Sequence, residues 1–129
     1  MRIPSSIAVL GFSLVAFVGA AQAQGNAEEG EAVFKKCRTC HDVGAGAKNK
    51  VGPALNNIIG RKAASIDGFA YSSDMKGLGA NGFVWSEENL GKYLENVRSV
   101  VANGKMVFPG LKDEQDRKDV IAYLRKFSK

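Results

Sequence analysis

Five consecutive residues form a pattern with a definite chemistry. Cys37, Arg38, Thr39, Cys40 and His41 spell C-x-x-C-H, which is the pattern of c-type haem attachment. Two thiols one helical turn apart can each form a thioether with a haem vinyl group, and the next residue can then offer its imidazole to the iron. The motif therefore predicts one haem c, attached through Cys37 and Cys40, with His41 as an axial ligand.

The same two cysteines could instead form part of a zinc knuckle or of a thiol exchange pair. A structural zinc site takes about four ligands, whereas the chain has two cysteines and one histidine. A thioredoxin-like pair is expected in a βαβ setting, and residues 82–85 are the only strand candidate. Haem attachment is favoured over both, but the motif alone leaves open whether the protein is a carrier or a haem enzyme or gas sensor.

The second axial ligand decides between those functions. His41 is the sole histidine, so a second imidazole is excluded, and Met75 and Met106 are the methionines that follow Met1. A lone methionine is usually core filler, but Met106 lies in a stretch, 97–110, that lacks helical periodicity, and long irregular stretches are often functional. We favour Met106 over Met75. His/Met ligation would fill both axial positions and raise the reduction potential, which favours a one-electron carrier.

The N-terminal residues predict export. Arg2 precedes an apolar run over 7–18, and small residues then lead to Ala21-Gln22-Ala23, as in a secretory signal peptide. The run is shorter than the roughly 20 apolar residues that a membrane anchor needs. We expect residues 1–23 to be cleaved, leaving residues 24–129 as a monohaem cytochrome c domain in the periplasm.

Charge and cysteine usage narrow the possibilities further. Without Arg2, 17 of the 18 basic residues remain against 13 acidic ones, so the exported part is basic. No nucleic-acid-binding signature accompanies this charge, and an acidic protein or membrane surface is the better partner. The two cysteines lie too close together to close a stabilising disulfide loop. The haem is instead expected to fill part of the hydrophobic core and to stabilise the fold through its covalent bonds to the chain.

The remaining chain reads as short helices separated by glycine-rich loops, which predicts an all-α class. Three of the helices have suitable N-cap residues: Asn26, Ser86 and Asp113. The expected elements are a helix from 26 into the cysteine motif, a helical turn over 53–59, a brief turn over 71–76, a helix after 86 and a final helix after 113.

With these motifs the chain resembles the class I cytochromes c, particularly the bacterial c2 type and the mitochondrial proteins. The resemblance covers the whole chain after residue 23 and implies a small cytochrome c fold, with about five short helices around one haem. Besides C-x-x-C-H, its landmarks are Gly52-Pro53-Ala54-Leu55, Gly60-Arg61-Lys62, Gly68-Phe69-Ala70-Tyr71, Trp85, Tyr93-Leu94-Glu95-Asn96, Lys105-Met106-Val107-Phe108 and Ile121-Ala122-Tyr123-Leu124.

The resemblance also implies roles for residues around the haem. The carbonyl of Pro53 is expected to accept a hydrogen bond from His41, which would fix the imidazole. Tyr93 is expected to donate a hydrogen bond to the sulfur of Met106. Haem propionates are expected to be bound by Arg61, Tyr71 and Trp85. A close crossing of the first and last helices is expected at Gly30, Phe34 and Tyr123.

Two segments depart from the family pattern. Mitochondrial members have Pro-Gly-Thr before the Lys-Met of the ligand loop, whereas this chain has Ala102-Asn103-Gly104. The threonine hydroxyl that usually helps to hold a propionate is therefore missing. The segment from Ser72 to Asn81 is also longer than in the mitochondrial proteins.

The resemblance finally implies partners. A soluble, monomeric carrier of this type is no enzyme; it takes electrons from a membrane cytochrome bc complex and passes them to a photosynthetic reaction centre or a terminal oxidase, touching the membrane only transiently. Docking is expected to use lysines around the haem edge, which would steer acidic partners. The candidates are Lys35, Lys36, Lys50, Lys62, Lys105 and Lys112.

Overall fold

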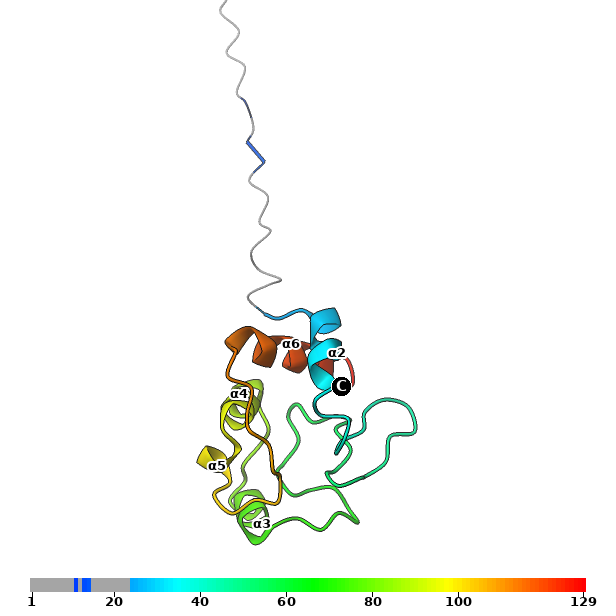
Figure 1. The fold of residues 1–129 in the computed structure, drawn as a ribbon, viewed down its shortest axis with the longest axis vertical. Helices are drawn as coiled ribbons and strands as arrows, with labels where there is room; N and C mark the ends of the chain where they lie inside the picture. The colour runs from blue at the N-terminus through cyan, green and yellow to red at the C-terminus, as the bar shows by residue number, and fades with distance from the viewer. Residues whose placement is uncertain (1–10, 12, 15–23) are drawn as a thin grey trace, which may run out of the picture.

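The computed structural model describes residues 11, 13, 14 and 24–129, so that the predicted signal peptide and its cleavage after Ala23 fall, but for three isolated positions, outside the described residues. Figure 1 shows helices at one side and along the top, with irregular loops filling the rest. The described part holds five helices: α2 (Ala27–Phe34), α3 (Ser73–Ala80), α4 (Glu87–Glu95), α5 (Val97–Val100) and α6 (Glu114–Arg125).

Three helices begin at the predicted polar caps. The Asn26 side chain accepts hydrogen bonds from the first backbone N–H groups of α2, and Asp113 does the same for α6. Ser86 accepts from the backbone N–H of Asn89 at the start of α4. Because the first N–H groups of a helix have no partner within the helix, these side chains fix where each helix starts.

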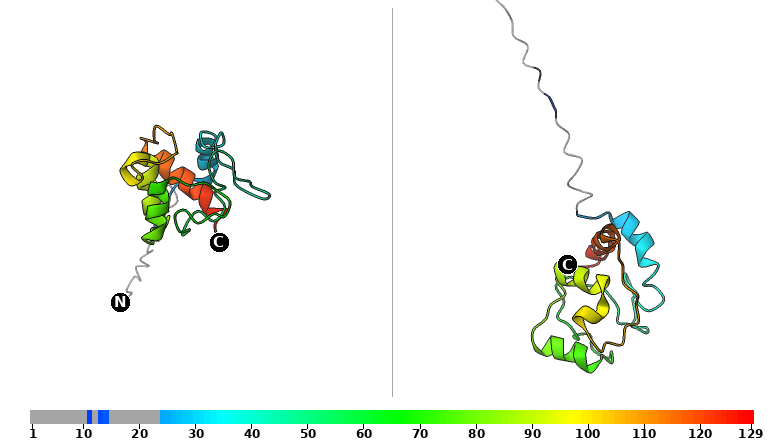
Figure 2. Two further views of the ribbon diagram at one scale, coloured as in Figure 1. Left: turned by 90° about the horizontal axis from the view of Figure 1, so that it is seen from below. Right: turned by 60° about the vertical axis from the view of Figure 1, so that its left-hand side comes forward.

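Helices α2 and α6 cross closely at the top of the molecule (Figures 1 and 2). Gly30 is buried at the crossing, and a Cβ atom there would lie 1.9 Å from the backbone oxygen of Asp119. Phe34 is fully buried, and its ring centroid lies 5.4 Å from that of Tyr123. The backbone N–H of Asn26 donates to the Asp119 carboxylate at 2.7 Å. The expected crossing of the first and last helices is therefore present.

The hydrophobic core lies where α4 meets α6 and the loops below them. Helix α4 buries Leu90, Tyr93 and Leu94 on one face. Helix α6 buries a run from Asp119 to Leu124. The apolar stripes predicted for these two helices therefore form the core, together with Phe34, Trp85, Val97, Val101 and Leu111.

The predicted helical turn over 53–59 is wrong, since the segment consists of separate turns. Its backbone groups bond elsewhere: the N–H of Asn57 donates to the carbonyl of Phe127, and Asn57 adopts a left-handed φ of 58°. The Asn56 side chain pairs with both backbone groups of Gly44, at 2.7 and 2.8 Å. Within this segment, only the N–H of Ile58 donates locally, to the carbonyl of Leu55 at 3.1 Å, so longer-range bonds replace most of those that a helix would need.

Two further segments are more helical than the sequence predicts. The brief turn expected over 71–76 is the full helix α3, which Ser72 caps by accepting from the N–H of Met75 at 3.1 Å. The stretch 97–110 lacks helical periodicity in the sequence, yet it begins with the single turn α5, capped by Asn96. Short polar caps start both helices where apolar periodicity is weak.

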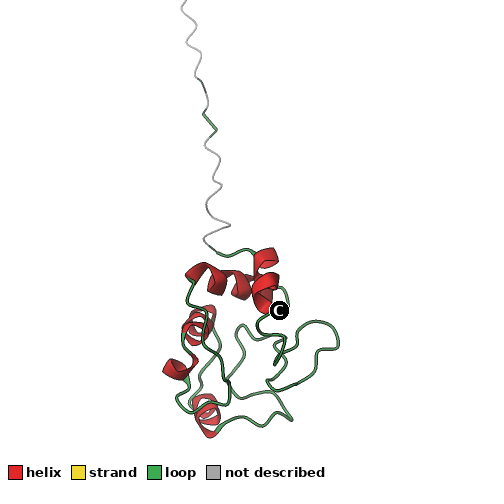
Figure 3. Cartoon of the chain, in the orientation of Figure 1, coloured by secondary structure: helices red, strands yellow, loops and turns green. Residues whose placement is uncertain are grey.

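Strand structure is almost absent from the described residues, where Figure 3 draws only helices and loops. The candidate strand over 82–85 contributes one isolated bridge, between Val84 and Lys62. The all-α class is therefore confirmed. Among the described helices, none is long and apolar enough to span a bilayer.

Candidate functional site

The cysteine motif forms a tight turn immediately after α2. The backbone N–H groups of Cys40 and His41 both donate to the carbonyl of Cys37, at 3.1 and 2.9 Å. The N–H of Gly52 donates to the carbonyl of Cys40 at 2.8 Å. Both thiols are free and half-buried. The turn thus brings the two sulfur-bearing residues and the imidazole onto one short piece of backbone.

His41 is held by the predicted contact. Its Nδ1 lies 2.7 Å from the carbonyl oxygen of Pro53. Because a carbonyl can only accept, Nδ1 carries the proton and donates, and Nε2 is left with its lone pair. Burial lowers the pKa of His41, with a smaller opposing effect from the Pro53 carbonyl. A neutral imidazole with one free nitrogen is the form that binds a metal.

Gly52 belongs to the site, although the sequence presented it only as part of a family landmark. A Cβ atom at this position would lie 2.3 Å from Cε1 of His41 and less than 3 Å from both ring nitrogens. Any side chain here would therefore displace the ring. A glycine immediately before the proline that anchors a histidine is the sequence signal that points to this close approach.

The Cys37 thiol is poorly suited to thiol exchange in this fold. Burial raises the pKa of Cys37 to about 11, although the charge of nearby Lys36 acts in the opposite direction. The thiolate is the reactive form of cysteine, and reactive cysteines usually have a lowered pKa. The environment of Cys37 thus disfavours the thiol oxidoreductase hypothesis.

Arg61, one of the predicted propionate ligands, interacts electrostatically with His41 and with Tyr71, another of them. Nη1 of Arg61 donates to the backbone carbonyls of Ala54 and Asn56, at 3.0 and 3.1 Å. Burial lowers the pKa of Arg61, and interaction with Tyr71 partly offsets this. The Tyr71 hydroxyl accepts from the N–H of Ile66 at 3.2 Å, so that its own proton is available to an acceptor.

Trp85 and Tyr93 lie together in the core, only 5% and 8% exposed, with their ring centroids 4.9 Å apart. Neither the indole nor the phenol forms a hydrogen bond within the part of the chain that the structure describes. The expected bond from Tyr93 to the Met106 sulfur stays a prediction. Burial raises the pKa of Tyr93 to about 12, so the phenol keeps its proton.

Both candidate methionines are half-buried and pack against the same core cluster as Cys37. Burial therefore does not distinguish them, but their backbones do. Met75 lies in the first turn of α3, where its N–H is used by the Ser72 cap. Met106 lies in the irregular segment 101–113 between α5 and α6. A loop can adjust its backbone to a ligand more readily than a capped helical turn.

The residues present fit a haem c. The donor set is two free thiols, a neutral imidazole with one free nitrogen and a half-buried thioether. A side chain at Gly52 would fill the space that the imidazole occupies. The buried rings of Trp85 and Tyr93 lie side by side in the same core. This combination matches covalent attachment with nitrogen and sulfur axial ligands.

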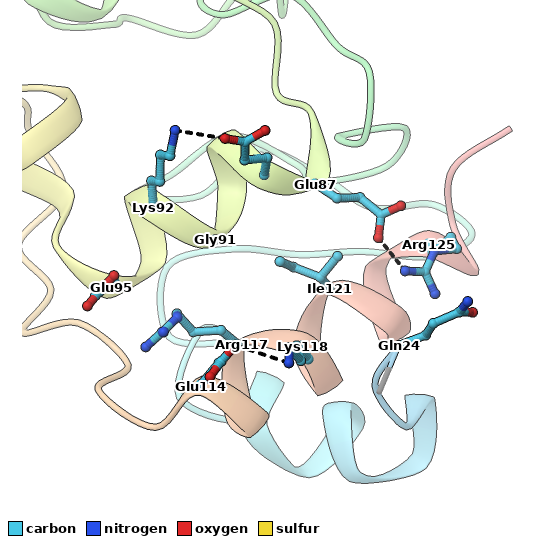
Figure 4. A pocket seen from close by; sticks show the side chains of 11 residues that line it. Gln24, Glu87, Gly91, Lys92, Glu95, Glu114, Arg117, Lys118, Ile121 and Arg125 are labelled. Atoms are coloured by element: carbon cyan, nitrogen blue, oxygen red, sulfur yellow. Dashed lines mark hydrogen bonds and ion pairs between the residues drawn. The ribbon is translucent and has the colours of Figure 1, made fainter. Parts of the chain in front are cut away.

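A separate open groove of about 680 Å³ lies between α4 and α6 (Figure 4). Charged side chains line it, with Ile121 among them. The ion pair between Arg125 and Glu87 joins its two walls, whereas Lys92–Glu88 and Lys118–Glu114 are pairs within α4 and within α6. None of the predicted site residues is among its lining. The groove is thus distinct from the site built around His41.

A small helical domain with a C-x-x-C-H turn and an anchored imidazole defines a haem-attachment domain. The family model for cytochrome c matches residues 27–128. The chain belongs to the cytochrome c family, carries one covalently attached haem c, and is an electron-transfer protein rather than an enzyme.

Relatives that match most of the chain are also cytochromes c. Cytochrome c2 of Rhodomicrobium vannielii is 52% identical, covering 92% of this chain and 91% of that protein. Cytochrome c-550 of Ancylobacter novellus is 52% identical, covering 78% of this chain and 94% of its own length. The solved cytochrome c2 of Rhodospirillum centenum is 45% identical, with a TM-score of 0.75 over 81% of this chain and all of that one.

Proposed function

We propose that this electron carrier holds its haem through thioethers to Cys37 and Cys40 and binds the iron axially with His41 and Met106. The observation that carries the proposal is the 2.7 Å contact between His41 Nδ1 and the Pro53 carbonyl. It keeps one imidazole nitrogen protonated and leaves the other for a metal. When bound, the haem supplies an iron that gains or loses one electron.

The surrounding residues would keep the coordination constant in both oxidation states. Pro53 and Gly52 fix the imidazole from two directions, one by a hydrogen bond and one by close packing. Contacts of this kind orient metal ligands and tune their basicity. Because a fixed ligand moves little when the charge on its metal changes, such a site favours fast electron transfer.

Three side chains are proposed to neutralise the propionates: Arg61, Tyr71 and Trp85. The charge of Arg61 and the free proton of Tyr71 support this assignment. A buried carboxylate needs a partner, because an unpaired one costs several kcal/mol. Tyr93 is proposed to donate to the Met106 sulfur in the loaded protein.

We further propose that the protein is exported to the periplasm and links a membrane cytochrome bc complex to a reaction centre or terminal oxidase. The relatives named cytochrome c2 support a bc complex and a reaction centre as partners. The six lysines named above are all exposed. They would steer acidic partners, in a manner that weakens with salt.

The ligation is tested by replacing each methionine in the haem-loaded protein. Met106→Ala is expected to abolish the methionine-to-iron charge-transfer band of the ferric protein and to lower the reduction potential. Met75→Leu, the matched control, is expected to leave both unchanged. If Met75→Leu abolishes the band and Met106→Ala does not, the assignment is reversed. Rapid carbon monoxide binding by the native ferrous protein would instead indicate an open sixth site.

The partner assignment is tested in membranes of the source organism. The reduced protein is expected to be oxidised quickly by one membrane acceptor, at a rate that falls as salt is raised. A rate that does not depend on salt would contradict docking through the lysines. Inhibitors selective for reaction centres or for oxidases would identify the acceptor.

A further inference from the structure

The segment that carries Met106 is tied to α3 by one acidic side chain. Oδ2 of Asp74 accepts two hydrogen bonds from Asn103, one from its backbone N–H at 2.9 Å and one from its side-chain amide at 3.1 Å. The two residues are 29 positions apart in sequence. Asn103 lies three residues before Met106, in the position where the chain departs from the mitochondrial Pro-Gly-Thr.

Asp74 is held in place at the start of a helix. Asp74 lies in the first turn of α3, behind the Ser72 cap. Helix N-termini carry partial positive charge, which stabilises a carboxylate there. Hydrogen bonds to a charged acceptor are about twice as strong as neutral ones. The pair with Asn103 is therefore stronger than an ordinary loop contact, although it lies near the surface.

The other contacts of the segment are mostly local. The N–H of Gly104 donates to the carbonyl of Val101 at 3.3 Å, and Arg98 donates to the carbonyl of Ala102 at 3.2 Å. Lys105 Nζ donates to the carbonyl of Ala70 at 2.8 Å, close to the start of α3. Both long-range attachments of residues 102–105 therefore lead to the segment 70–74.

We propose that Asp74 is a positioning residue that clamps Asn103 and so holds the Met106 segment closed over the site. The proposal rests on the proposed ligation by Met106. It gives a role to the long segment from Ser72 to Asn81: helix α3 supplies from outside the loop the rigidity that a proline would supply within it. Loss of the clamp increases the fraction of molecules in which Met106 has left the iron.

The test uses imidazole as a competing ligand for the ferric, haem-loaded protein. Imidazole can bind only when Met106 has left, so its apparent affinity reports the open fraction. Asp74→Ala is expected to raise this affinity about tenfold, as loss of a charged hydrogen bond predicts. The matched control is Asp67→Ala, which removes the same charge from an exposed neighbouring loop. An equal effect of both variants would overturn the proposal.

A double-mutant cycle separates the clamp from a general effect on α3. Asn103→Ala removes the side-chain donor and is expected to raise imidazole affinity by a smaller factor in the native background. In the Asp74→Ala background it is expected to have no effect. Multiplicative effects would mean that Asp74 acts only on its own helix, and the proposal would fail.

Hydrogen exchange tests the clamp independently of ligation. In the reduced protein, Asp74→Ala is expected to remove protection from the Asn103 backbone amide while amides of α6 keep theirs. If the native protein lacks the methionine-to-iron band, the proposed ligation fails, whatever Asp74 does. If the band is present and neither imidazole affinity nor Asn103 exchange responds to Asp74→Ala, the clamp alone fails.

Discussion

The crossing of α2 with α6 and the loops around His41 are held together by different forces. At the crossing, buried side chains interlock: Gly30 admits the backbone of α6, and Phe34 packs on Tyr123. Around His41, single polar contacts determine the backbone, among them the bond to Pro53 and the pairing of Asn56 with Gly44. A packed crossing resists any added volume, whereas a loop is disturbed only where one of its contacts is lost.

This comparison indicates that the crossing determines the stability of the fold, whereas the loops determine the geometry of the site. Damage at the crossing should destabilise the whole fold and leave the iron spectrum of folded molecules unchanged. Damage in the loops should alter the spectrum first. The variants that follow test this separation in the haem-loaded protein, by measuring unfolding and the iron spectrum on the same samples.

The largest effect is expected at Gly30. Gly30→Ala places a Cβ atom 1.9 Å from the Asp119 carbonyl oxygen, so the two helices must move apart. We expect the free energy of unfolding to fall by about 3 kcal/mol or more, as for severe overpacking. Denaturant unfolding followed by circular dichroism measures this loss.

The matched control is Gly77→Ala in α3, where an added Cβ meets nothing within 4 Å. It should be neutral or stabilise by up to about 1 kcal/mol, since alanine favours helix. If Gly30→Ala were as well tolerated as Gly77→Ala, the crossing would not be the packed element described above.

The next effect is expected at Gly52, on the other side of the comparison. Gly52→Ala forces a methyl group against the His41 ring, with 2.3 Å to Cε1. We expect a shift in the iron spectrum and the reduction potential, with a loss of about 2 kcal/mol in unfolding free energy. Redox titration and absorbance measure the site, and an unchanged potential would contradict the packing role of Gly52.

Helices with polar caps and apolar stripes could be predicted from sequence, but the loops and their contacts could not. The starts at Asn26, Ser86 and Asp113 follow from local residues alone. The prediction of a helical turn over 53–59 failed because the backbone of Asn57 bonds to Phe127, 70 residues away. No local sequence pattern indicates such a partner. Long-range pairing thus overrides the helix signal that Pro53 gives.

The candidate site shows the same limit. Cys37, Cys40 and His41 follow from spacing, because their chemistry requires them to be near neighbours. Asp74 gave no signal of its role, since its partner Asn103 is distant in sequence and both residues are common in loops. A contact between two polar residues that belong to no motif can be identified only from the folded structure, not from the sequence.

A smaller effect is expected at Asn56, which closes the loop between the cysteine motif and Pro53. Asn56→Ala removes the partner of the Gly44 backbone N–H, and the Gly44 carbonyl keeps only the bond from the N–H of Ala47. We expect a loss of about 1 to 2 kcal/mol and faster hydrogen exchange in residues 44–52. Asn49→Ala, which removes a single exposed bond to Ala54, should cost less. A reversed order would contradict the importance of loop closure.

The smallest effect is expected in the charged groove between α4 and α6. Arg125 pairs with Glu87 across the groove, and the two side chains are 44% and 46% exposed. Exposed ion pairs contribute little, so Arg125→Ala should change the unfolding free energy by less than about 0.5 kcal/mol and leave the iron spectrum unchanged. A loss comparable to that of Asn56→Ala would mean that the groove shares in the packing of the crossing.

The crossing of α2 and α6 also has a consequence for the order of events during synthesis. The bond from Asn26 to Asp119 joins residues 93 positions apart, so the fold cannot close until almost the last residue has been made. Contacts of such long range form late. Cys37 and Cys40 are made well before α6. The Cys37 thiol, which burial makes less reactive in the folded protein, is therefore more open to attachment chemistry before the fold closes.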